Sequence, residues 1–509
     1  MVWVWSAGAL LILLISFWAP VFLGFGAMLA IGCSIGGAIR GVQAYRRMVV
    51  DKRLEHFGKE FITLEALKVL ARKAAAAKQY WLGRGFPWSD IEATKLHTLM
   101  SMGVVRTIGR VAQHHEGAYW VHGLAAETDL FSEVANLVGH TLIVGSTRVG
   151  KTRLFDVLIA QAIFRGETVI IIDPKGDHGL AQNARAVCDA TGEGDRFVYF
   201  HPAHPDRSAC IDPLRNWNRK TELASRVAAL IPSETGADPF TAFGWKVLND
   251  ITNGMIATGN RPNLVQLRRY VEGGPESLLL QALKIHFTTN VRDWESRVAS
   301  YLRRYKDRPL QAYVAFYQEV AINEAQSVDL DGLISTFEHN RDHFQKMIAS
   351  LIPILSMLTS DPLQELLSPD FDPGHERLVT DMSKVIRGNK VVYIGLDSLA
   401  DSTVGSAIGS IMLADLAAVA GDRYNYGIQT LTPVNLFIDE AAEVLNQPAI
   451  QLMNKGGGAD FRVTIATQTF ADFASRLGDE NKARQVLANT NNKIALRVLD
   501  SETQKYIAE

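Results

Sequence analysis

The chain has 509 residues, more than one ordinary hydrophobic core requires, so two or more domains are expected. An apolar content of 47% and a charged content of 21% exclude a disordered protein. Three widely separated cysteines without metal-ligand spacing exclude a disulfide framework and fit a reducing compartment. The net charge of −2 gives no general support for nucleic-acid binding, so any contact with DNA would have to be local.

The amino-terminal residues 1–39 contain no Asp, Glu, Lys or Arg. As one helix they would extend over roughly 58 Å, about twice the ~30 Å hydrocarbon core of a bilayer. Ala19-Pro20 divides them into Met1–Trp18 and Val21–Ile39, each near the minimum spanning length. We therefore expect a hairpin of two transmembrane helices, with a single span as the alternative.

A basic region follows the apolar one. Residues 40–84 hold eleven Lys/Arg against four Asp/Glu, beginning with Arg40 and Arg46. The positive-inside rule places this side of the membrane, and the rest of the chain, in the cytoplasm. We expect a juxtamembrane helix that touches anionic lipid, with DNA binding as the alternative. The remainder of residues 40–130 is predicted as a linker that is rich in turns at Gly83–Trp88.

Residues 145–152 match the phosphate-binding loop pattern G-x-x-x-x-G-K-[ST] at every fixed position. An apolar run precedes this loop and a helical stretch follows it, as the mechanism requires. Backbone N–H groups of such a loop surround phosphate oxygens at a helix N-terminus, while the lysine reaches the β- and γ-phosphates and the hydroxyl holds Mg²⁺. The pattern therefore predicts ATP and Mg²⁺ binding by Gly145, Ser146, Thr147, Arg148, Val149, Gly150, Lys151 and Thr152.

Short β-branched runs that end in polar residues predict buried parallel strands. They are Thr141–Val144, Thr168–Ile172, Phe197–Phe200, Val391–Ile394, Val434–Ile438, Val463–Ala466 and Lys493–Val498. Alternation of these strands with helices predicts an α/β domain with a mostly parallel sheet, formed by residues 131–214 and 381–509. Residues 215–380 show helical patterns throughout, so we expect an all-α insertion domain there.

The run Asn435–Glu440 is an apolar strand that ends in two acids. Asp439 is expected to hold Mg²⁺ through water, and Glu440 to orient and deprotonate the attacking water. Asp173 also ends a strand, but Pro174-Lys175 follows it and offers no second carboxylate. Asp173 and Lys175 are therefore assigned either to the rim of the nucleotide site or to structural support.

Two further patterns have weaker functional interpretations. Gln468 ends a strand, where it could sense the γ-phosphate, or it is simply a polar strand end. Basic and aromatic residues alternate over Tyr301–Lys306, where a solvated helix face is favoured over contact with single-stranded DNA. The pair His114-His115 and the segment His201–Pro205 are interpreted as loop residues, and metal binding is not expected there.

Taken together, these residues resemble the type IV coupling proteins of bacterial conjugation, the family of the TraD, TraG and VirD4 ATPases. The resemblance rests on the apolar hairpin, the phosphate loop, the run VIIIDPKGD at Val169–Asp177, the helical insertion, Asp439-Glu440 and the strand before Gln468. The segment WLGRGFPW, Trp81–Trp88, is most similar to TraD proteins of integrative conjugative elements.

The resemblance implies a RecA-like P-loop ATPase that assembles as a homo-hexamer at the bacterial inner membrane, as a multi-pass protein. It would bind a relaxase–DNA complex, pass it to a type IV secretion channel and help to pump single-stranded DNA at the expense of ATP. Lys151, Thr152, Asp439, Glu440 and Gln468 would take the roles given above.

This chain departs from the family pattern in one respect. Relatives often carry an arginine in the turn before the strand that ends in the glutamine, where it can serve the active site of the neighbouring subunit. Residues 454–460 of this chain, NKGGGAD, contain no arginine, and Arg462 is the nearest substitute. The chain also stops at Glu509 within an expected helix, which leaves open a fragment without the family's carboxy-terminal part.

Two other functions remain open. One is an FtsK/HerA-like double-stranded DNA translocase, against which the size of the insertion and the run VIIIDPKGD argue. The other is a membrane receptor for secretion substrates that binds ATP without translocating. The cognate relaxase and any DNA sequence preference do not follow from the sequence.

Overall fold

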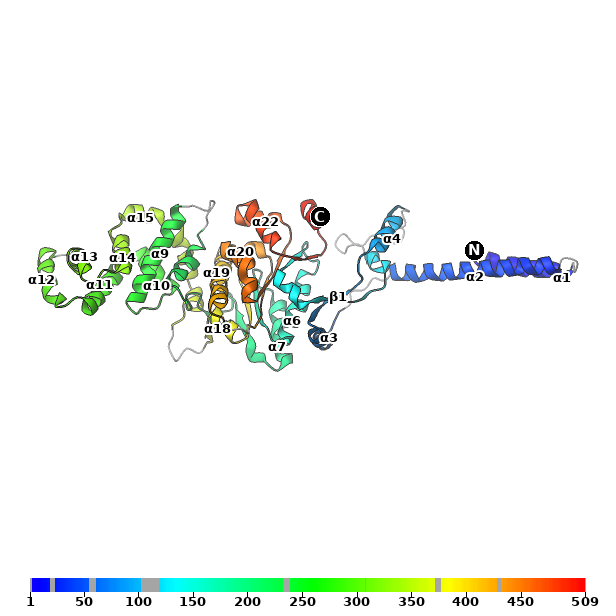
Figure 1. Cartoon of the computed structure of the whole chain (residues 1–509), viewed down its shortest axis with the longest axis horizontal. Coiled ribbons are helices and arrows are strands. Elements are labelled where there is room, and N and C mark those ends of the chain that lie inside the picture. Colours follow the sequence, from blue (N-terminus) through cyan, green and yellow to red (C-terminus); the bar gives the residue numbers. More distant parts are fainter. Residues whose placement is uncertain are drawn as a thin grey trace. The chain divides into compact units, whose positions relative to one another are not determined.

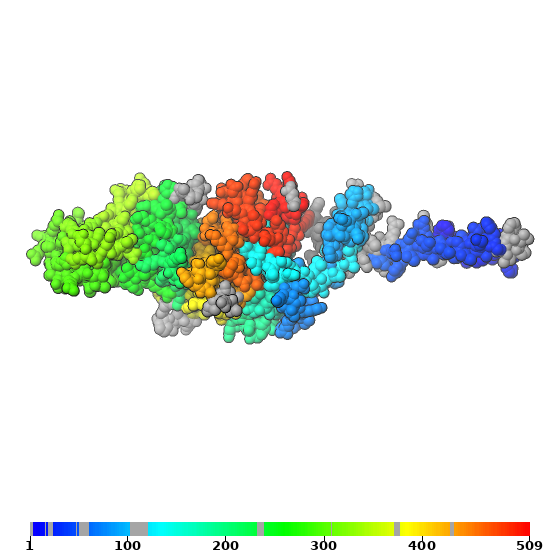
Figure 2. Space-filling view, in the orientation of Figure 1, coloured from blue at the N-terminus to red at the C-terminus, as the bar shows by residue number. Residues whose placement is uncertain are grey.

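The structure is a computed structural model that describes residues 2–18, 23–54, 61–101, 119–231, 239–306, 308–370, 377–427 and 432–508 (Figures 1 and 2). It divides into two compact units. The first comprises Met1–Thr63 and Trp81–Ser132, and the second Leu64–Tyr80 and Glu133–Glu509.

In the first unit, helices α1 (Val2–Trp18) and α2 (Leu23–Leu54) lie side by side (Figure 1). The Trp5 ring lies over Gly36, where an added Cβ would come within 3.0 Å of it, so the glycine permits close packing of the two helices. This contact between positions near opposite ends of the apolar region agrees with the expected hairpin. Its turn at Ala19-Pro20 lies outside the described residues.

Two stretches of the described residues are long and apolar enough to cross a membrane. One is Gly24–Arg46 in α2, whose side chains are largely exposed. The other, Ser402–Tyr426, is mostly buried and forms the core helix α19 of the second unit. The apolar stretch of α1, Val4–Ile15, is shorter than a typical span.

The first unit also contains a strand pair that the sequence did not predict. Strand β1 (Gln79–Gly85) pairs with β2 (Thr128–Glu133). The prediction of a turn was therefore wrong for residues 83–85, which belong to the strand. Trp81 Nε1 donates to Asp129 Oδ1 at 3.1 Å, and Gly85 passes so close to Leu130 that an added Cβ would lie 2.9 Å from its Cδ1. Cross-strand contacts with a distant segment thus override the local glycine signal.

The second unit is built around a seven-stranded sheet in the order β11-β3-β10-β9-β4-β8-β5. All of its strand pairs are parallel. All seven predicted strands are present: β3 (Thr141–Val144), β4 (Thr168–Asp173), β5 (Phe197–Phe200), β8 (Val391–Gly395), β9 (Val434–Ile438), β10 (Phe461–Thr467) and β11 (Asn492–Ala495). The last one ends three residues before the predicted end at Val498. Every residue of β3, β4, β8 and β9 is buried, as expected where helices cover both faces.

Helices connect the parallel strands and cover the sheet. They are α3 (Leu64–Ala76), α6 (Lys151–Phe164), α7 (His178–Thr191), α18 (Met382–Arg387), α19 (Ser402–Tyr426), α20 (Gln447–Lys455), α21 (Ala471–Leu477), α22 (Glu480–Ala488) and α23 (Ser501–Ala508). Helix α6 packs with α3 and α7, whereas α19 packs with α18 and α20. Since parallel strands end at the same edge, the segments after β3, β9, β10 and β4 meet there.

An all-helical insertion interrupts this domain between β6 (Cys210–Ile211) and β7 (Val379–Thr380), which pair with each other. Its helices are α8 (Lys220–Ala228), α9 (Pro239–Ala257), α10 (Leu264–Gly273), α11 (Glu276–Asn290), α12 (Trp294–Arg304), α13 (Pro309–Glu319), α14 (Val328–Glu338), α15 (Arg341–Met347), α16 (Leu351–Leu358) and α17 (Leu363–Leu367). One hydrophobic cluster runs from the sheet into these helices. The predicted fold class, an α/β P-loop domain with a helical insertion, is confirmed.

A buried polar network fastens the insertion to the sheet domain. Arg226 of α8 and Asp415 of α19 form an ion pair of 3.0 Å, and both side chains are almost completely buried. Arg226 also donates to Pro213 O at 2.8 Å, and Asn216 Nδ2 donates to Asp415 Oδ1 at 3.1 Å. Burial raises the pKa of Asp415 to about 7, although the charge of Arg226 opposes this shift.

We expect Arg226→Met to destabilise the second unit by about 3–5 kcal/mol at pH 8, because it leaves a buried carboxylate without a partner. The loss should be smaller at pH 6. A carboxyl whose folded pKa lies above its unfolded value contributes stability at low pH and loses it as the pH rises through about 7. Thermal unfolding of the full chain in detergent at both pH values measures this.

Arg484→Met is the matched control, since Arg484 forms an exposed i,i+4 pair with Glu480. It should change the unfolding free energy by less than about 1 kcal/mol at either pH. Equal effects of the two substitutions would contradict a stabilising role for the buried network.

Candidate active site

The loop after β3 has the backbone geometry of a phosphate cradle. Helix α6 begins at Lys151, and its N-cap Gly150 has a φ of 103°, in the left-handed region that favours glycine. Gly145 is required by a close approach, because an added Cβ would lie 2.8 Å from Val149 Cγ2 and 2.9 Å from Leu496 Cβ. The loop thus presents backbone N–H groups at the N-terminus of α6, which is a favourable site for an anion.

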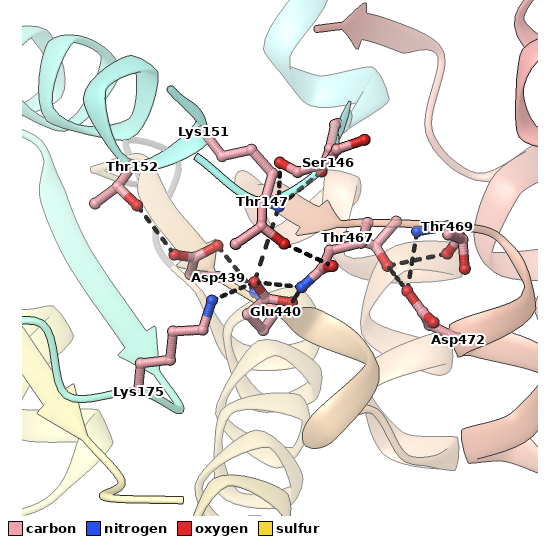
Figure 3. A network of polar contacts seen from close by, with 12 residues as sticks. Ser146, Thr147, Lys151, Thr152, Lys175, Asp439, Glu440, Thr467, Thr469 and Asp472 are labelled. Atoms are coloured by element: carbon pink, nitrogen blue, oxygen red, sulfur yellow. Dashed lines mark hydrogen bonds and ion pairs between the residues drawn. The ribbon is translucent and has the colours of Figure 1, made fainter. Parts of the chain in front are cut away.

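Lys151 extends back over this loop (Figure 3). Its Nζ donates to Gly145 O at 2.7 Å and to Ser146 O at 3.4 Å, and the side chain is buried. Burial lowers the pKa of Lys151, while the carboxylates of Glu440 and Asp439 oppose this shift. A buried ammonium with few water contacts is well suited to pairing with a phosphate anion.

Thr152 and Asp439 bring two hard oxygen ligands together (Figure 3). The Thr152 hydroxyl lies 3.5 Å from Asp439 Oδ2, and Asp439 Oδ1 accepts a hydrogen bond of 3.0 Å from the Glu440 amide. Burial, followed by the charges of Asp173 and Glu440, raises the pKa of Asp439 to about 6. A buried carboxylate beside a hydroxyl at a phosphate cradle fits Mg²⁺, which prefers oxygen ligands and retains several waters.

The Glu440 carboxylate lies close to the side chains of several other residues of the site. Its Oε1 lies 2.6 Å from Lys175 Nζ and 3.8 Å from Lys151 Nζ. Gln468 Nε2 donates to both carboxylate oxygens, at 3.3 and 3.2 Å. The backbone of Glu440 has a φ of 42°, so the chain turns sharply where β9 ends. The carboxylate is held by groups from three neighbouring strand ends.

Gln468 also touches the phosphate loop. The Thr147 hydroxyl donates to Gln468 Oε1 at 3.2 Å, so the glutamine amide bridges Thr147 and Glu440. The structure therefore brings together the predicted residues Thr147, Lys151, Thr152, Asp439, Glu440 and Gln468. Their catalytic and binding roles remain predictions.

The sequence assigned Asp173 and Lys175 together, either to the rim of the nucleotide site or to structural support. The structure places the two side chains differently. Asp173 is fully buried and supports the loop after β4: it accepts from the amides of Lys175 and Asp177 at 3.0 and 2.6 Å, and from Tyr393 Oη at 2.8 Å. Burial raises the pKa of Asp173. Lys175, in contrast, points to Glu440. Asp173 therefore holds the backbone of this loop, whereas Lys175 lies beside Glu440.

Arg462 does not lie at this edge of the sheet. It stands near the start of β10, whereas Gln468 follows the end of the same strand. Arg462 NH1 pairs with Glu167 at 2.9 Å, and its guanidinium is largely buried. An arginine that acts on the site of a neighbouring subunit has to be exposed, and the Arg462 guanidinium is not. This structure therefore does not support Arg462 as the substitute for a trans-acting arginine.

The basic and aromatic stretch at the end of α12 is engaged within the insertion. Tyr301 Oη donates to Glu319 Oε2 at 2.8 Å, and Arg304 lies 3.8 Å from the same carboxylate. These contacts agree with the favoured interpretation as a helix face. His114 and His115 lie outside the described residues.

Residues after β11 also contribute to the phosphate loop, which the sequence gave no reason to expect. The Ser146 amide donates to Arg497 O at 2.9 Å, and Leu496 packs on Gly145. The loop after Gln468 is held in turn by α23, because the Phe470 amide donates to Thr503 Oγ1 at 3.2 Å. No local motif signals such long-range contacts.

A parallel sheet with a phosphate loop after β3 and paired acids after β9 defines a P-loop NTPase fold. Two family models match the chain: "TraM recognition site of TraD and TraG" over residues 433–509, and "Helicase HerA, central domain" over residues 125–237. The first match confirms the resemblance to the coupling-protein family that the sequence indicated. No curated protein matches the chain.

Several solved structures are similar at low identity. The bacterial conjugative coupling protein TrwBdeltaN70, in its unbound form, has 15% identity and a TM-score of 0.48, over 77% of this chain and 74% of that chain. TrwB in complex with the non-hydrolysable ATP analogue ADPNP has 15% identity and a TM-score of 0.44, over 77% and 76%. VirB4 of Thermoanaerobacter pseudethanolicus has 13% identity and a TM-score of 0.37, over 72% and 80%.

Gly145→Ala tests the cradle. The added methyl group should clash with Val149 and Leu496, so that holding the loop in its present geometry costs about 1–3 kcal/mol. Because the phosphates need this geometry, the relaxed loop should bind an ATP analogue roughly five- to 150-fold more weakly. Gly421→Ala, in α19, meets no atom within 4 Å and should leave the affinity unchanged. Titration of a fluorescent analogue measures both, and equal affinities would contradict the assignment of the loop.

Proposed function

We propose that this chain is an ATPase whose site is the carboxyl edge of the sheet. The convergence of Lys151, Lys175 and Gln468 on Glu440, beside the Thr152–Asp439 pair, is the observation that carries the proposal. Residues Gly145–Thr152 would hold the phosphates of ATP, and Thr152 with Asp439 would hold Mg²⁺, which supplies positive charge next to the phosphates when bound.

Glu440 is proposed to orient the attacking water and to accept its proton. The carboxylate stands next to the phosphate loop, within reach of Lys151, which is the position such a base needs. Gln468 would report the state of the γ-phosphate, because its amide contacts both the phosphate loop and Glu440. Lys151 would stabilise charge on the transferred phosphoryl group.

Glu440→Gln should lower kcat for ATP hydrolysis by about 10²–10⁴-fold, because it removes the proton acceptor. It should leave analogue binding close to the wild-type value. Lys151→Ala should weaken binding itself, by about 1.5–3 kcal/mol for a hydrogen bond to a charged group. Steady-state hydrolysis and analogue titration of the full chain in lipid nanodiscs separate the two effects.

Glu443→Gln is the matched control, since that carboxylate lies three residues further along the chain and its charge acts on Arg476. It should hydrolyse ATP at nearly the wild-type rate. Hydrolysis that survives Glu440→Gln would contradict the catalytic assignment.

The biological role that fits this site best is coupling in conjugation. We propose that ATP hydrolysis drives the transfer of single-stranded DNA, delivered by a relaxase, into a type IV secretion channel. The match of residues 433–509 to the TraM recognition site of TraD and TraG supports this role. A homo-hexamer, formed by residues 131–214 and 381–509, would surround the DNA, with residues 215–380 as the insertion domain.

The membrane end supports an inner-membrane location. Gly24–Arg46 is long enough to span, and the close packing of α1 on α2 supports a second span by Met1–Trp18, hence a multi-pass protein. The basic residues that follow residue 39, beginning with Arg40 and Arg46, favour a cytoplasmic ATPase domain. Residues 40–130 would link the membrane spans to the ATPase domain and contact membrane lipid.

A second candidate is a double-stranded DNA translocase, and the match of residues 125–237 to the HerA central domain favours it. DNA-stimulated ATPase distinguishes the candidates. We expect single-stranded DNA to raise the hydrolysis rate of the full chain several-fold more than duplex DNA of the same length does, because coupling proteins deliver single strands. Stronger stimulation by duplex DNA would favour the HerA-like function.

The third possibility, a receptor that binds ATP without translocating, is tested in cells. Conjugative transfer should be lost with Glu440→Gln and retained with Glu443→Gln, at equal protein abundance. Transfer that continues without hydrolysis would exclude the motor and favour the receptor.

A further inference from the structure

Lys175 lies in the segment Asp173–Asp177, between β4 and α7, and has no role in the function proposed so far. The backbone of this segment is fixed at several points. Asp173 accepts from two of its amides, and Asp177 caps α7 by accepting from the Gly179 and Leu180 amides. An added Cβ on Gly176 would lie 2.5 Å from Nε2 of the buried His201.

The side chain of Lys175 is therefore the adaptable part of a rigid segment. It is 43% exposed, whereas its partner Glu440 is 11% exposed. The separation of 2.6 Å is shorter than the 3.8 Å between Lys151 and the same Glu440 oxygen. The ammonium can leave for another anion while the loop stays in place, because the loop is anchored by its backbone.

Burial lowers the pKa of Lys175, but the hydrogen bond to Glu440 and the nearby carboxylates outweigh it, and the pKa lies above its ordinary value. The lysine is thus charged under physiological conditions. A carboxylate that already accepts from an ammonium and from the Gln468 amide has fewer lone pairs free for a water molecule.

We propose that Lys175 is a positioning residue that restrains Glu440 in the resting enzyme and releases it when the phosphates of ATP compete for the ammonium. The inference rests on the proposed ATPase function. Phosphate oxygens carry more negative charge than one carboxylate, so the competition favours the nucleotide. The Glu440 carboxylate is thereby kept from binding a water molecule until a nucleotide occupies the site.

The first test measures the ion pair itself. A zero-length carbodiimide joins a lysine amine to a carboxylate in direct contact, so the full chain without nucleotide should yield a peptide linked through Lys175 and Glu440. ADPNP with Mg²⁺ should reduce its yield several-fold. Lys246 and Asp250 of α9 are the matched control, with a separation of 3.0 Å and side chains 46% and 10% exposed. Their link should form equally with and without ADPNP.

The second test measures the restraint. Without nucleotide, Glu440 in Lys175→Gln should couple several-fold faster than in the wild type to a small added amine in the presence of carbodiimide, because no ammonium covers the carboxylate. Lys175→Arg, which keeps the charge, should restore the slow coupling. Equal coupling of Glu440 in Lys175→Gln and in the wild type would overturn the inference, as would a Lys175–Glu440 link that does not form or does not respond to ADPNP. The parent proposal is judged separately, by ATP hydrolysis in Glu440→Gln.

Discussion

The parallel pairing of buried strands is the constraint on which the whole site depends. The phosphate loop, the acids and the glutamine are up to 323 residues apart in sequence, yet β3, β10, β9 and β4 are neighbours in the sheet. Since all four point the same way, their carboxyl ends deliver these side chains to one edge. A shift of register by one residue would turn Asp439 and Gln468 to the opposite faces.

This constraint also explains how much the sequence could predict. The seven sheet strands were predictable because each is a short run rich in apolar residues, and four of them, β3, β4, β8 and β9, are buried on both faces. The strand pair β1–β2 was not, because Gly83 and Gly85 favour turns locally and only contact with residues near Leu130 stabilises the extended chain. In the site, the motifs identified Lys151, Asp439 and Glu440. The contact of Lys175 with Glu440 depends on strand order, which no local pattern specifies.

The balance of side-chain charges in the site limits how much phosphate charge the site can neutralise by itself. Two ammonium groups, Lys151 and Lys175, face two carboxylates, Asp439 and Glu440, so their charges nearly cancel. The two lysines alone therefore do not neutralise a bound triphosphate, so the backbone N–H groups, Mg²⁺ and any cation from a neighbouring molecule have to contribute. Arg462 is already neutralised by Glu167, so a cation supplied by another subunit has to come from a different residue.

Helix α19 contacts both the base of the insertion and the segment that follows Glu440. Asp415, midway along this 25-residue helix, is bound to Arg226 at the base of the insertion. Ser410 lies earlier in the same helix. Its carbonyl oxygen accepts from Asn446 Nδ2 at 2.8 Å, and its hydroxyl donates to Val444 O at 3.2 Å, in the segment that follows Glu440. A helix of this length, about 37 Å, moves as a stiff rod. The insertion therefore cannot shift against the strand that ends at Glu440 without breaking hydrogen bonds, so the two are mechanically coupled through α19.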